Sequence, residues 1–218
     1  MSPADLSRCR LYAILDLGYV ELEQAASVTE KLLTGGADVV QLRAKDRAGS
    51  EISQLARGLT QITRPRNVPL IINDHAEVAR DVGADGVHVG QDDMSVEEAR
   101  AIVGSNRVVG KSTHSLDQAV RAFHEGADYI GFGPIFATPT KPEYQPVGLD
   151  EIERVHEAVQ IPIFCIGGIK LDNLPKVIEA GARRVVIVSG LLQASDIVGY
   201  GRAVQDLLQR NSKIENQQ

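Results

Sequence analysis

The sequence of 218 residues predicts a (β/α)₈ barrel, and three observations lead to that prediction. First, a helical stretch ends in Gly-Ala and runs into an apolar β segment at Gly36, Gly83, Gly126 and Gly181. Second, these junctions are separated by about twice the length of one strand-plus-helix unit, which indicates every second unit of a longer series. Third, further short apolar segments lie between them and bring the expected number of strands to eight.

The expected strands are short, rich in branched residues and bounded by turn residues. In chain order they are Arg10–Leu15, the segment from Val39, Leu70–Ile72, the segment from Gly86, Arg107–Gly110, the segment from Tyr129, Ile163–Ile166 and the segment from Val185. Between them, segments such as 22–33 and 99–103 carry apolar residues at spacings of three and four, as amphipathic helices do. At each Gly-Ala junction, glycine suits the left-handed end of a helix.

Length and composition set bounds on this fold. The chain is small for a barrel of this type, which usually has roughly 250 residues. An open doubly wound sheet is the alternative, and no early Gly-x-Gly-x-x-Gly turn supports it. With 43% hydrophobic and 24% charged residues, we expect a single domain over 1–218, with a frayed polar tail over 211–218.

Charge and targeting signals argue against several classes of partner. A net charge of −6 argues against a general nucleic-acid binder. No apolar run reaches the roughly 18 residues of a membrane span, and the first residues do not resemble a secretory signal. Cys9 and Cys165 do not suggest a disulfide framework, so we expect a cytoplasmic protein.

Polar residues follow five successive strands, at the end of a barrel where enzymes carry their chemistry. They lie in Gln41–Lys45, Asn73-Asp74, Gln91–Asp93, Lys111-Ser112 and the loop from Gly133 to Lys141. Taken singly, the carboxylates could cap the following helices, and Arg43 and Lys45 could be solvated loop charges. Their combination on adjacent strand ends instead suits Mg²⁺ and an oxygen-rich anion such as a diphosphate.

The last two strands suggest a second anion site. They end in Gly167-Gly168 and Ser189-Gly190, where barrels commonly bind a phosphate through backbone N–H groups. The alternative is that these glycines only serve tight turns. Because this site is neutral, it suits a monophosphate.

Six spaced motifs carry a resemblance to a known family. They are Gln41–Lys45, Ile72–Asp74, Gly90–Asp93, Gly110–His114, Gly133–Lys141 and Gly167–Ile169. In this order they resemble the thiamine phosphate synthase family. The resemblance implies a barrel enzyme of thiamine biosynthesis, a Mg²⁺-dependent transferase. It would join 4-amino-5-hydroxymethyl-2-methylpyrimidine diphosphate to 4-methyl-5-(2-phosphoethyl)thiazole and release diphosphate.

The resemblance also assigns roles to residues of this sequence. It implies pyrimidine diphosphate contacts at Gln41, Leu42, Arg43, Ala44, Lys45, Asn73, Ser112 and Lys141. Of these, Arg43, Lys45, Ser112 and Lys141 are the implied catalytic residues. The implied thiazole phosphate contacts are Thr138, Pro139, Thr140, Gly168, Val188 and Ser189, and the implied Mg²⁺ ligands are Asp74 and Asp93.

The sequence departs from the family pattern at Ala44, where a Glu is usual, at Ala137, where Pro is frequent, and at His75. Ala44 removes a carboxylate that could steady Arg43 and Lys45.

The histidines leave two other functions open. We expect His88 to be a packed barrel residue, and His124 and His156 to lie on the surface. His114 lies in a motif shared with the thiazole tautomerases of the same superfamily, where it moves protons. A tautomerase and a non-catalytic, phosphate-binding regulatory barrel are therefore the alternatives. The sequence leaves the oligomeric state open.

Overall fold

The computed structural model describes residues 4–138 and 144–215. Eight parallel strands pair in chain order, and β8 returns to pair with β1, so the barrel closes. The strands are β1 Leu11–Asp16, β2 Val39–Arg43, β3 Leu70–Asn73, β4 Gly86–Val89, β5 Val108–Thr113, β6 Tyr129–Phe132, β7 Ile163–Cys165 and β8 Val185–Ile187. The predicted (β/α)₈ barrel is confirmed, and its strand bounds differ from the predicted ones by one to a few residues.

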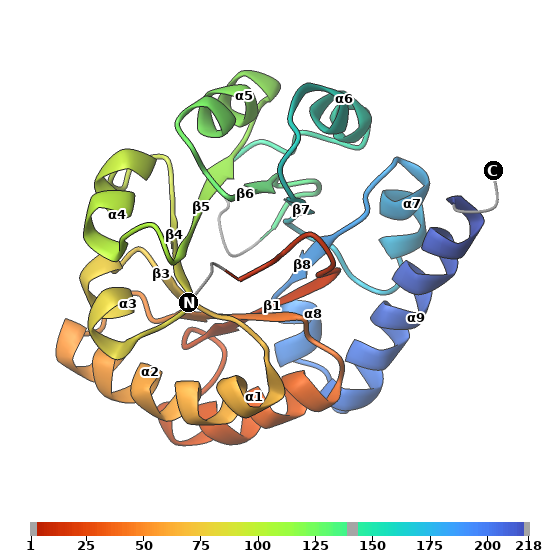
Figure 1. Ribbon diagram of the computed structural model, residues 1–218. Helices are drawn as coiled ribbons and strands as arrows, with labels where there is room; N and C mark the ends of the chain where they lie inside the picture. The colour runs from red at the N-terminus through yellow and green to blue at the C-terminus, as the bar shows by residue number, and fades with distance from the viewer. Residues whose placement is uncertain (1–3, 139–143, 216–218) are drawn as a thin grey trace.

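Helices surround the strands in chain order (Figure 1). They are α1 Ala25–Thr34, α2 Gly49–Thr63, α3 Ala76–Val82, α4 Val96–Val103, α5 Leu116–His124, α6 Glu151–Ala158, α7 Leu174–Glu179, α8 Ser189–Leu192 and α9 Ile197–Glu215, with 3₁₀ turns at Leu22–Gln24 and Arg64–Arg66. α9 continues through Glu215 and so includes part of the stretch 211–218, for which a frayed tail stays a prediction. None of the helices in the described ranges is long and apolar enough to cross a membrane.

The barrel has two separate hydrophobic cores. The larger core lies between the sheet and the helices and includes Leu15, Leu42 and Ile72. The smaller core fills the amino-terminal part of the barrel interior with alternate strand residues, among them Val39 and Val108. The strand alternation that separates the two cores also decides which side chains can reach a cavity inside the barrel.

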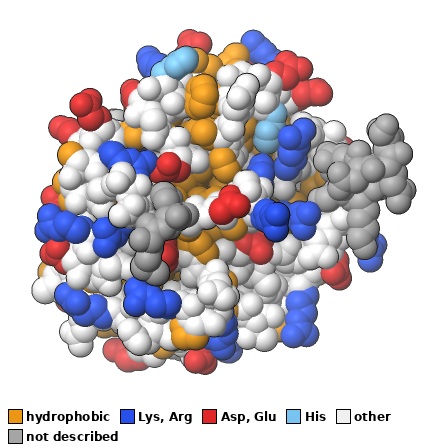
Figure 2. Space-filling view, in the orientation of Figure 1, with side chains coloured by type: hydrophobic (Ala, Val, Ile, Leu, Met, Phe, Trp, Pro, Cys, Tyr) orange, Lys and Arg blue, Asp and Glu red, His pale blue; other side chains and the backbone are white. Residues whose placement is uncertain are grey.

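The segment before β1 covers the amino-terminal end of the barrel. Leu6 is buried in the interior core, and Arg184, just before β8, donates from Nη2 to the carbonyl of Ser7 at 2.6 Å. In Figure 1 the segment that leads into β1 accordingly crosses the middle of the ring of strands. Figure 2 shows the same face, with charged side chains around its rim and hydrophobic ones between them near the centre. With this end covered, the opposite end is left for a ligand.

The Gly-Ala repeat has a structural cause that includes the residue after it. The four glycines all have left-handed φ, between 69° and 96°, as predicted. In three of the four junctions an aspartate follows, and its carboxylate accepts backbone N–H groups of the neighbouring strand. Asp38 accepts from Arg10 and Leu11 at 2.8 and 2.9 Å.

The other two junctions repeat this arrangement. Asp85 accepts from Leu70 at 2.9 Å, and Asp128 accepts from Val109 at 2.6 Å. Each aspartate therefore joins the entry of an even-numbered strand to the start of the odd-numbered strand before it. The same bonding thus recurs at three of the four junctions.

Candidate active site

A cavity opens inside the barrel at the carboxyl ends of the strands. With the solvent space at its mouth it measures about 1010 Å³. Its lining residues are Tyr12, Ile14, Asp16, Gln41, Arg43, Asn73, His88, Ser112, His114, Tyr129, Gly131, Gly133, Pro134, Thr138, Tyr144, Phe164, Ile166, Gly167, Gly168, Ile169, Val186, Val188 and Ser189. The cavity thus combines polar groups from the early strands with an apolar and glycine-rich wall from the later ones.

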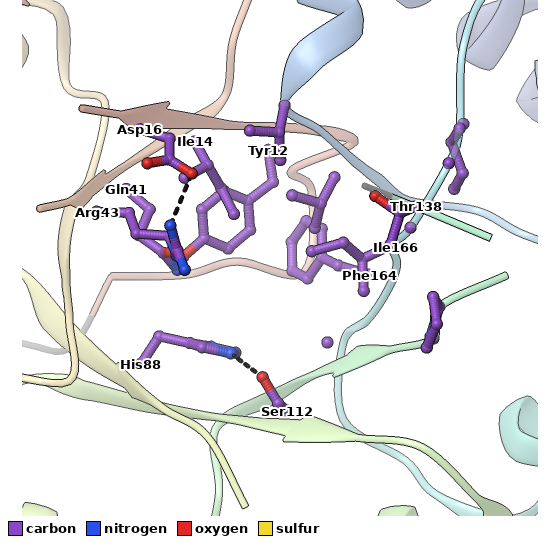
Figure 3. A pocket seen from close by; sticks show the side chains of 18 of the residues that line it. Tyr12, Ile14, Asp16, Gln41, Arg43, His88, Ser112, Thr138, Phe164 and Ile166 are labelled. Carbon is purple, nitrogen blue, oxygen red and sulfur yellow. Dashed lines mark hydrogen bonds and ion pairs between the residues drawn. The ribbon is translucent and has the colours of Figure 1, made fainter. Parts of the chain in front are cut away.

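Figure 3 shows these two sides. Asp16, Gln41 and Arg43 lie on one side, and Thr138, Phe164 and Ile166 lie on the opposite side. The structure therefore places residues of both predicted substrate sets around a single cavity. Whether they contact those substrates stays a prediction.

An ion pair fixes the cationic side of the cavity. Arg43 donates from Nη1 to Asp16 Oδ2 at 2.8 Å, and the Asp16 side chain is only 3% exposed. Asp16 Oδ1 accepts the N–H of Gly18 at 2.9 Å, so both carboxylate oxygens are used. Sequence reasoning missed Asp16, although it is the last residue of β1 and so lies at the same edge as the predicted residues.

Two predicted substrate contacts point away from the cavity. Leu42 and Ala44 are buried in the core between the sheet and the helices, because they alternate with Gln41 and Arg43 along the chain. Any ligand contact by these two residues would have to involve their backbone. Lys45 is exposed in the loop that follows β2.

A row of hydrogen bonds crosses the inside of the barrel below the cavity mouth. Gln41 donates from Nε2 to the hydroxyl of Tyr12 at 2.8 Å, and the hydroxyls of Tyr12 and Tyr129 are 2.9 Å apart. His88 Nδ1 lies 3.1 Å from the Tyr129 hydroxyl, and His88 Nε2 lies 2.9 Å from Ser112 Oγ. Figure 3 shows the bond between His88 and Ser112. The prediction of His88 as a packed residue is confirmed, but its ring also lines the cavity.

The predicted metal ligands lie on neighbouring loops. Asp74 follows β3 with a left-handed φ of 64°, and Asn73 donates from Nδ2 to its Oδ2. Asp93 is exposed in the loop after β4, where its Oδ2 accepts the N–H of Gly90 at 2.7 Å. Lys111 supports this loop from outside the cavity, because its buried ammonium donates to the Gly90 carbonyl at 2.7 Å.

No group of three or more His, Cys, Asp and Glu side chains that could hold a metal ion occurs in the part of the chain that the structure describes. Two carboxylates nevertheless fit Mg²⁺, which commonly takes one or two protein carboxylates and completes its shell with water and substrate phosphate oxygens. The predicted ligands are therefore compatible with a metal that arrives together with a phosphorylated substrate.

The predicted thiazole phosphate residues that the structure describes lie in the segments after β6, β7 and β8. Thr138, Gly168, Val188 and Ser189 all line it, whereas Pro139, Thr140 and Lys141 lie outside the described residues. Gly168 has a left-handed φ of 64°, and a Cβ there would lie 2.8 Å from the carbonyl oxygen of Ala137. Its glycine is therefore required by the turn itself, so a larger residue at 168 would not be a clean test of phosphate binding.

The remaining histidines differ in their surroundings. His114 lines the cavity, where its ring stacks on Tyr144 at 4.0 Å and its Nδ1 donates to the carbonyl of Gly133. His124 is exposed, as predicted. The expectation of a surface position for His156 is wrong, since His156 is half-buried and burial lowers its pKa to about 4.

Fold and cavity together place the chain among the TIM-barrel proteins that carry their site at the carboxyl ends of the strands. Residues 11–191 match the family model described as thiamine monophosphate synthase. The chain belongs to this family, whose synthases are transferases, as the six motifs led us to expect.

Relatives and a solved structure support this assignment over almost the whole chain. The thiamine-phosphate synthase of Chloroflexus aurantiacus is 43% identical over 95% of this chain and 96% of its own. That of Halalkalibacterium halodurans is 41% identical over 92% of this chain and 96% of its own. The structure of thiamine phosphate pyrophosphorylase from Pyrococcus furiosus matches with a TM-score of 0.85 and 31% identity, covering 93% of this chain and 96% of that one.

Proposed function

We propose that this chain joins 4-amino-5-hydroxymethyl-2-methylpyrimidine diphosphate to 4-methyl-5-(2-phosphoethyl)thiazole and forms thiamine phosphate and diphosphate. The observation that carries the proposal is that residues of both predicted substrate sets line one cavity, on opposite sides. A coupling enzyme needs its two substrates side by side, and holding them in reactive geometry can supply about 7–11 kcal/mol of the barrier in favourable cases.

The pyrimidine diphosphate would lie on the side formed by β1 to β5. Arg43, held by Asp16, and Lys45 would meet the diphosphate, together with Lys141 in the segment outside the described residues. The apolar and aromatic lining, which includes Ile14 and Phe164, suits flat heterocyclic rings.

Asp74 and Asp93 would hold Mg²⁺ against this diphosphate. When bound, the metal neutralises charge on the phosphate oxygens. For a test of these two ligands, Asn is the better substitution at 74, because Asn tolerates the left-handed backbone that Asp74 adopts. At 93, Asn keeps an oxygen that can accept the Gly90 N–H.

The reaction requires no acid or base in its main step. The bond between the pyrimidine methylene carbon and the diphosphate oxygen breaks, and the diphosphate leaves with the electron pair. The thiazole nitrogen then donates its lone pair to the carbon, which forms the new C–N bond. Arg43 and the lysines would stabilise the charge that grows on the leaving group.

The alternatives make different demands on the site. A tautomerase would require proton transfer by His114, and a regulatory barrel would bind phosphate without turnover. The relatives and the solved structure described above are all named as synthases or pyrophosphorylases, which supports the coupling reaction.

The two cysteines support a cytoplasmic location, which we also propose. Both are free thiols, and burial raises the pKa of each to about 12, so neither is poised to react. Such thiols are typical of proteins from a reducing compartment.

The purified chain, mixed with both substrates and Mg²⁺, should form thiamine phosphate, and excess chelator should stop the reaction. Asp74→Asn and Asp93→Asn should each lower the rate at least tenfold, about 1.4 kcal/mol. Absence of product with the unmodified chain would contradict the proposed reaction. Full activity in excess chelator would contradict the metal assignment alone.

A further inference from the structure

The hydrogen-bonded row inside the barrel joins two predicted substrate contacts that lie on strands far apart around the ring. Gln41 on β2 is at one end, Ser112 on β5 is at the other, and Tyr12, Tyr129 and His88 connect them. These three connecting side chains are 1%, 0% and 8% exposed, so water does not compete for most of their polar atoms. Along such a row each hydroxyl that accepts a hydrogen bond from one neighbour donates to the next. The direction of donation at one end therefore decides the direction at the other end.

A glycine on β5 makes the space that the Tyr129 ring of this row needs. A Cβ at position 110 would lie 2.1 Å from the Tyr129 ring, so only glycine at 110 on β5 admits that ring. A Cβ at Gly131, by contrast, would be 3.5 Å from the His88 ring, an ordinary contact distance. The tyrosine ring is thus built into the barrel interior and lies in a fixed position.

The direction of hydrogen-bond donation along the row follows from which atoms carry a proton. An amide nitrogen only donates, so the Tyr12 hydroxyl accepts from Gln41 and gives its own proton to Tyr129. The Tyr129 hydroxyl then donates to Nδ1 of His88, whose proton is on Nε2 and points to Ser112. The Ser112 oxygen therefore accepts inside the row. Its own proton can then be donated to an acceptor in the cavity, which Ser112 lines.

The burial of the two phenols keeps this order intact. Burial raises the pKa of both Tyr12 and Tyr129 above the ordinary value, so each keeps its proton at neutral pH. If the Gln41 amide were turned over, every bond of the row would reverse, and Ser112 would become an acceptor for the ligand. The orientation of one amide on β2 is thus coupled to the role of a hydroxyl on β5.

We propose that Tyr12, Tyr129 and His88 are positioning residues that fix the Gln41 amide and make Ser112 a hydrogen-bond donor toward the ligand. The ligand atom that faces Ser112 must then be an acceptor, such as a ring nitrogen or an ester oxygen. The identity of that ligand as the pyrimidine diphosphate rests on the proposed function. The order of the row itself does not depend on it.

The tautomer of His88 tests the order without any activity measurement. In ¹⁵N-histidine NMR of the whole chain, with His88→Gln to assign the signals, the ring proton of His88 should lie on Nε2 rather than on Nδ1. Tyr129→Phe removes the donor to Nδ1 and should shift His88 to a mixture of tautomers. The matched control is Tyr200→Phe, which removes a half-buried hydroxyl that accepts the Leu171 N–H at 2.9 Å outside the row, and it should leave the His88 signals unchanged.

Kinetics then test the positioning role. Tyr12→Phe and Tyr129→Phe should each raise the KM for the pyrimidine diphosphate about fivefold, the effect of one hydrogen bond, and leave the KM for the thiazole phosphate within about twofold. Tyr200→Phe should leave the KM for the pyrimidine diphosphate unchanged, and thermal unfolding of all three variants shows whether they fold.

Two NMR results would overturn the proposal: a His88 proton on Nδ1 in the unmodified chain, or a His88 tautomer that does not change with Tyr129→Phe. Equal changes in the two KM values would also overturn it, since a general loss of structure affects both substrates. Failure of the unmodified chain to form thiamine phosphate would contradict the proposed function instead, while the NMR result would still decide the order of the row.

Discussion

Arg43 depends on a buried carboxylate for its position. Asp16 is 3% exposed at its side chain and contacts Arg43 at 2.8 Å, whereas Ala44, where the family resemblance led us to expect Glu, is packed against the helices. The carboxylate that we expected to be missing beside Arg43 is therefore supplied by the neighbouring strand β1. Removing the partner of a mostly buried charge costs more than removing a surface ion pair.

Asp16→Asn should lower kcat/KM for the pyrimidine diphosphate at least tenfold, about 1.4 kcal/mol, because Arg43 loses the charge that orients it. Glu51→Gln is the matched control, since it removes the charge from an exposed pair with Arg47 at 3.7 Å. The control should stay within about twofold in a steady-state assay of thiamine phosphate formation. Equal effects of the two substitutions would show that Asp16 does not position Arg43.

His156 links the stability of the barrel to pH. Burial, with help from Arg183 and Arg184, lowers its pKa from 6.5 to about 4, and its Nε2 has no hydrogen-bond partner within the described residues. The unfolded chain takes up a proton near pH 6.5, whereas the folded chain keeps this ring neutral down to about pH 4. The free energy of unfolding therefore falls as the pH drops through this window.

Replacing His156 should reduce that loss. In urea unfolding between about pH 7 and about pH 4.5, His156→Gln should show a smaller decrease in the free energy of unfolding than the unmodified chain. His124→Gln, at an exposed position of α5, should behave like the unmodified chain. A pH dependence that is the same in all three proteins would mean that His156 does not remain neutral in the folded state.

At the scale of the elements, aspartates just before three strands bind the backbone at the start of the neighbouring strand. The carboxylates of Asp38, Asp85 and Asp128 each accept a backbone N–H at the start of the preceding strand. Asp38 has the largest set of partners, because Gln205 on α9 also donates to it at 2.8 Å. It thereby joins β1, β2 and the last helix.

Asp38→Ala should lower the free energy of unfolding by about 2–3 kcal/mol, because it leaves the N–H groups of Arg10 and Leu11 without their acceptor. Asp206→Ala, at an exposed position of the same last helix, should change it by less than about 0.5 kcal/mol. Chemical denaturation followed by circular dichroism measures both. A loss no larger than that of the control would contradict the role of Asp38.

The strands could be predicted from the sequence, but the side-chain contacts between distant strands could not. Apolar runs and the left-handed glycines predict the strands, since both are local properties of the chain. The period-two alternation of strands could also have shown that Leu42 and Ala44 face away from Gln41 and Arg43. The row from Gln41 to Ser112 could not be predicted, because it depends on five strands that closure of the barrel brings together.

At the scale of the whole molecule, closure of the barrel is what creates the site. The interior core fills the amino-terminal part and leaves the carboxyl ends open, so groups from β2 and from the loop after β6 face one another across a single cavity. Arg43 and Thr138 lie on opposite sides of it (Figure 3). This placement underlies the central claim that two phosphorylated substrates bind side by side.

Arg43→Gln and Thr138→Val test that claim most directly, because they change opposite sides and neither requires the left-handed turn at Gly168 to move. The measurement is the KM for each substrate in thiamine phosphate formation. Arg43→Gln should raise the KM for the pyrimidine diphosphate at least tenfold and leave the KM for the thiazole phosphate unchanged. Thr138→Val should raise the KM for the thiazole phosphate about fivefold and leave the KM for the pyrimidine diphosphate unchanged. If both substitutions raised the KM for the same substrate, the two-sided cavity would be wrong.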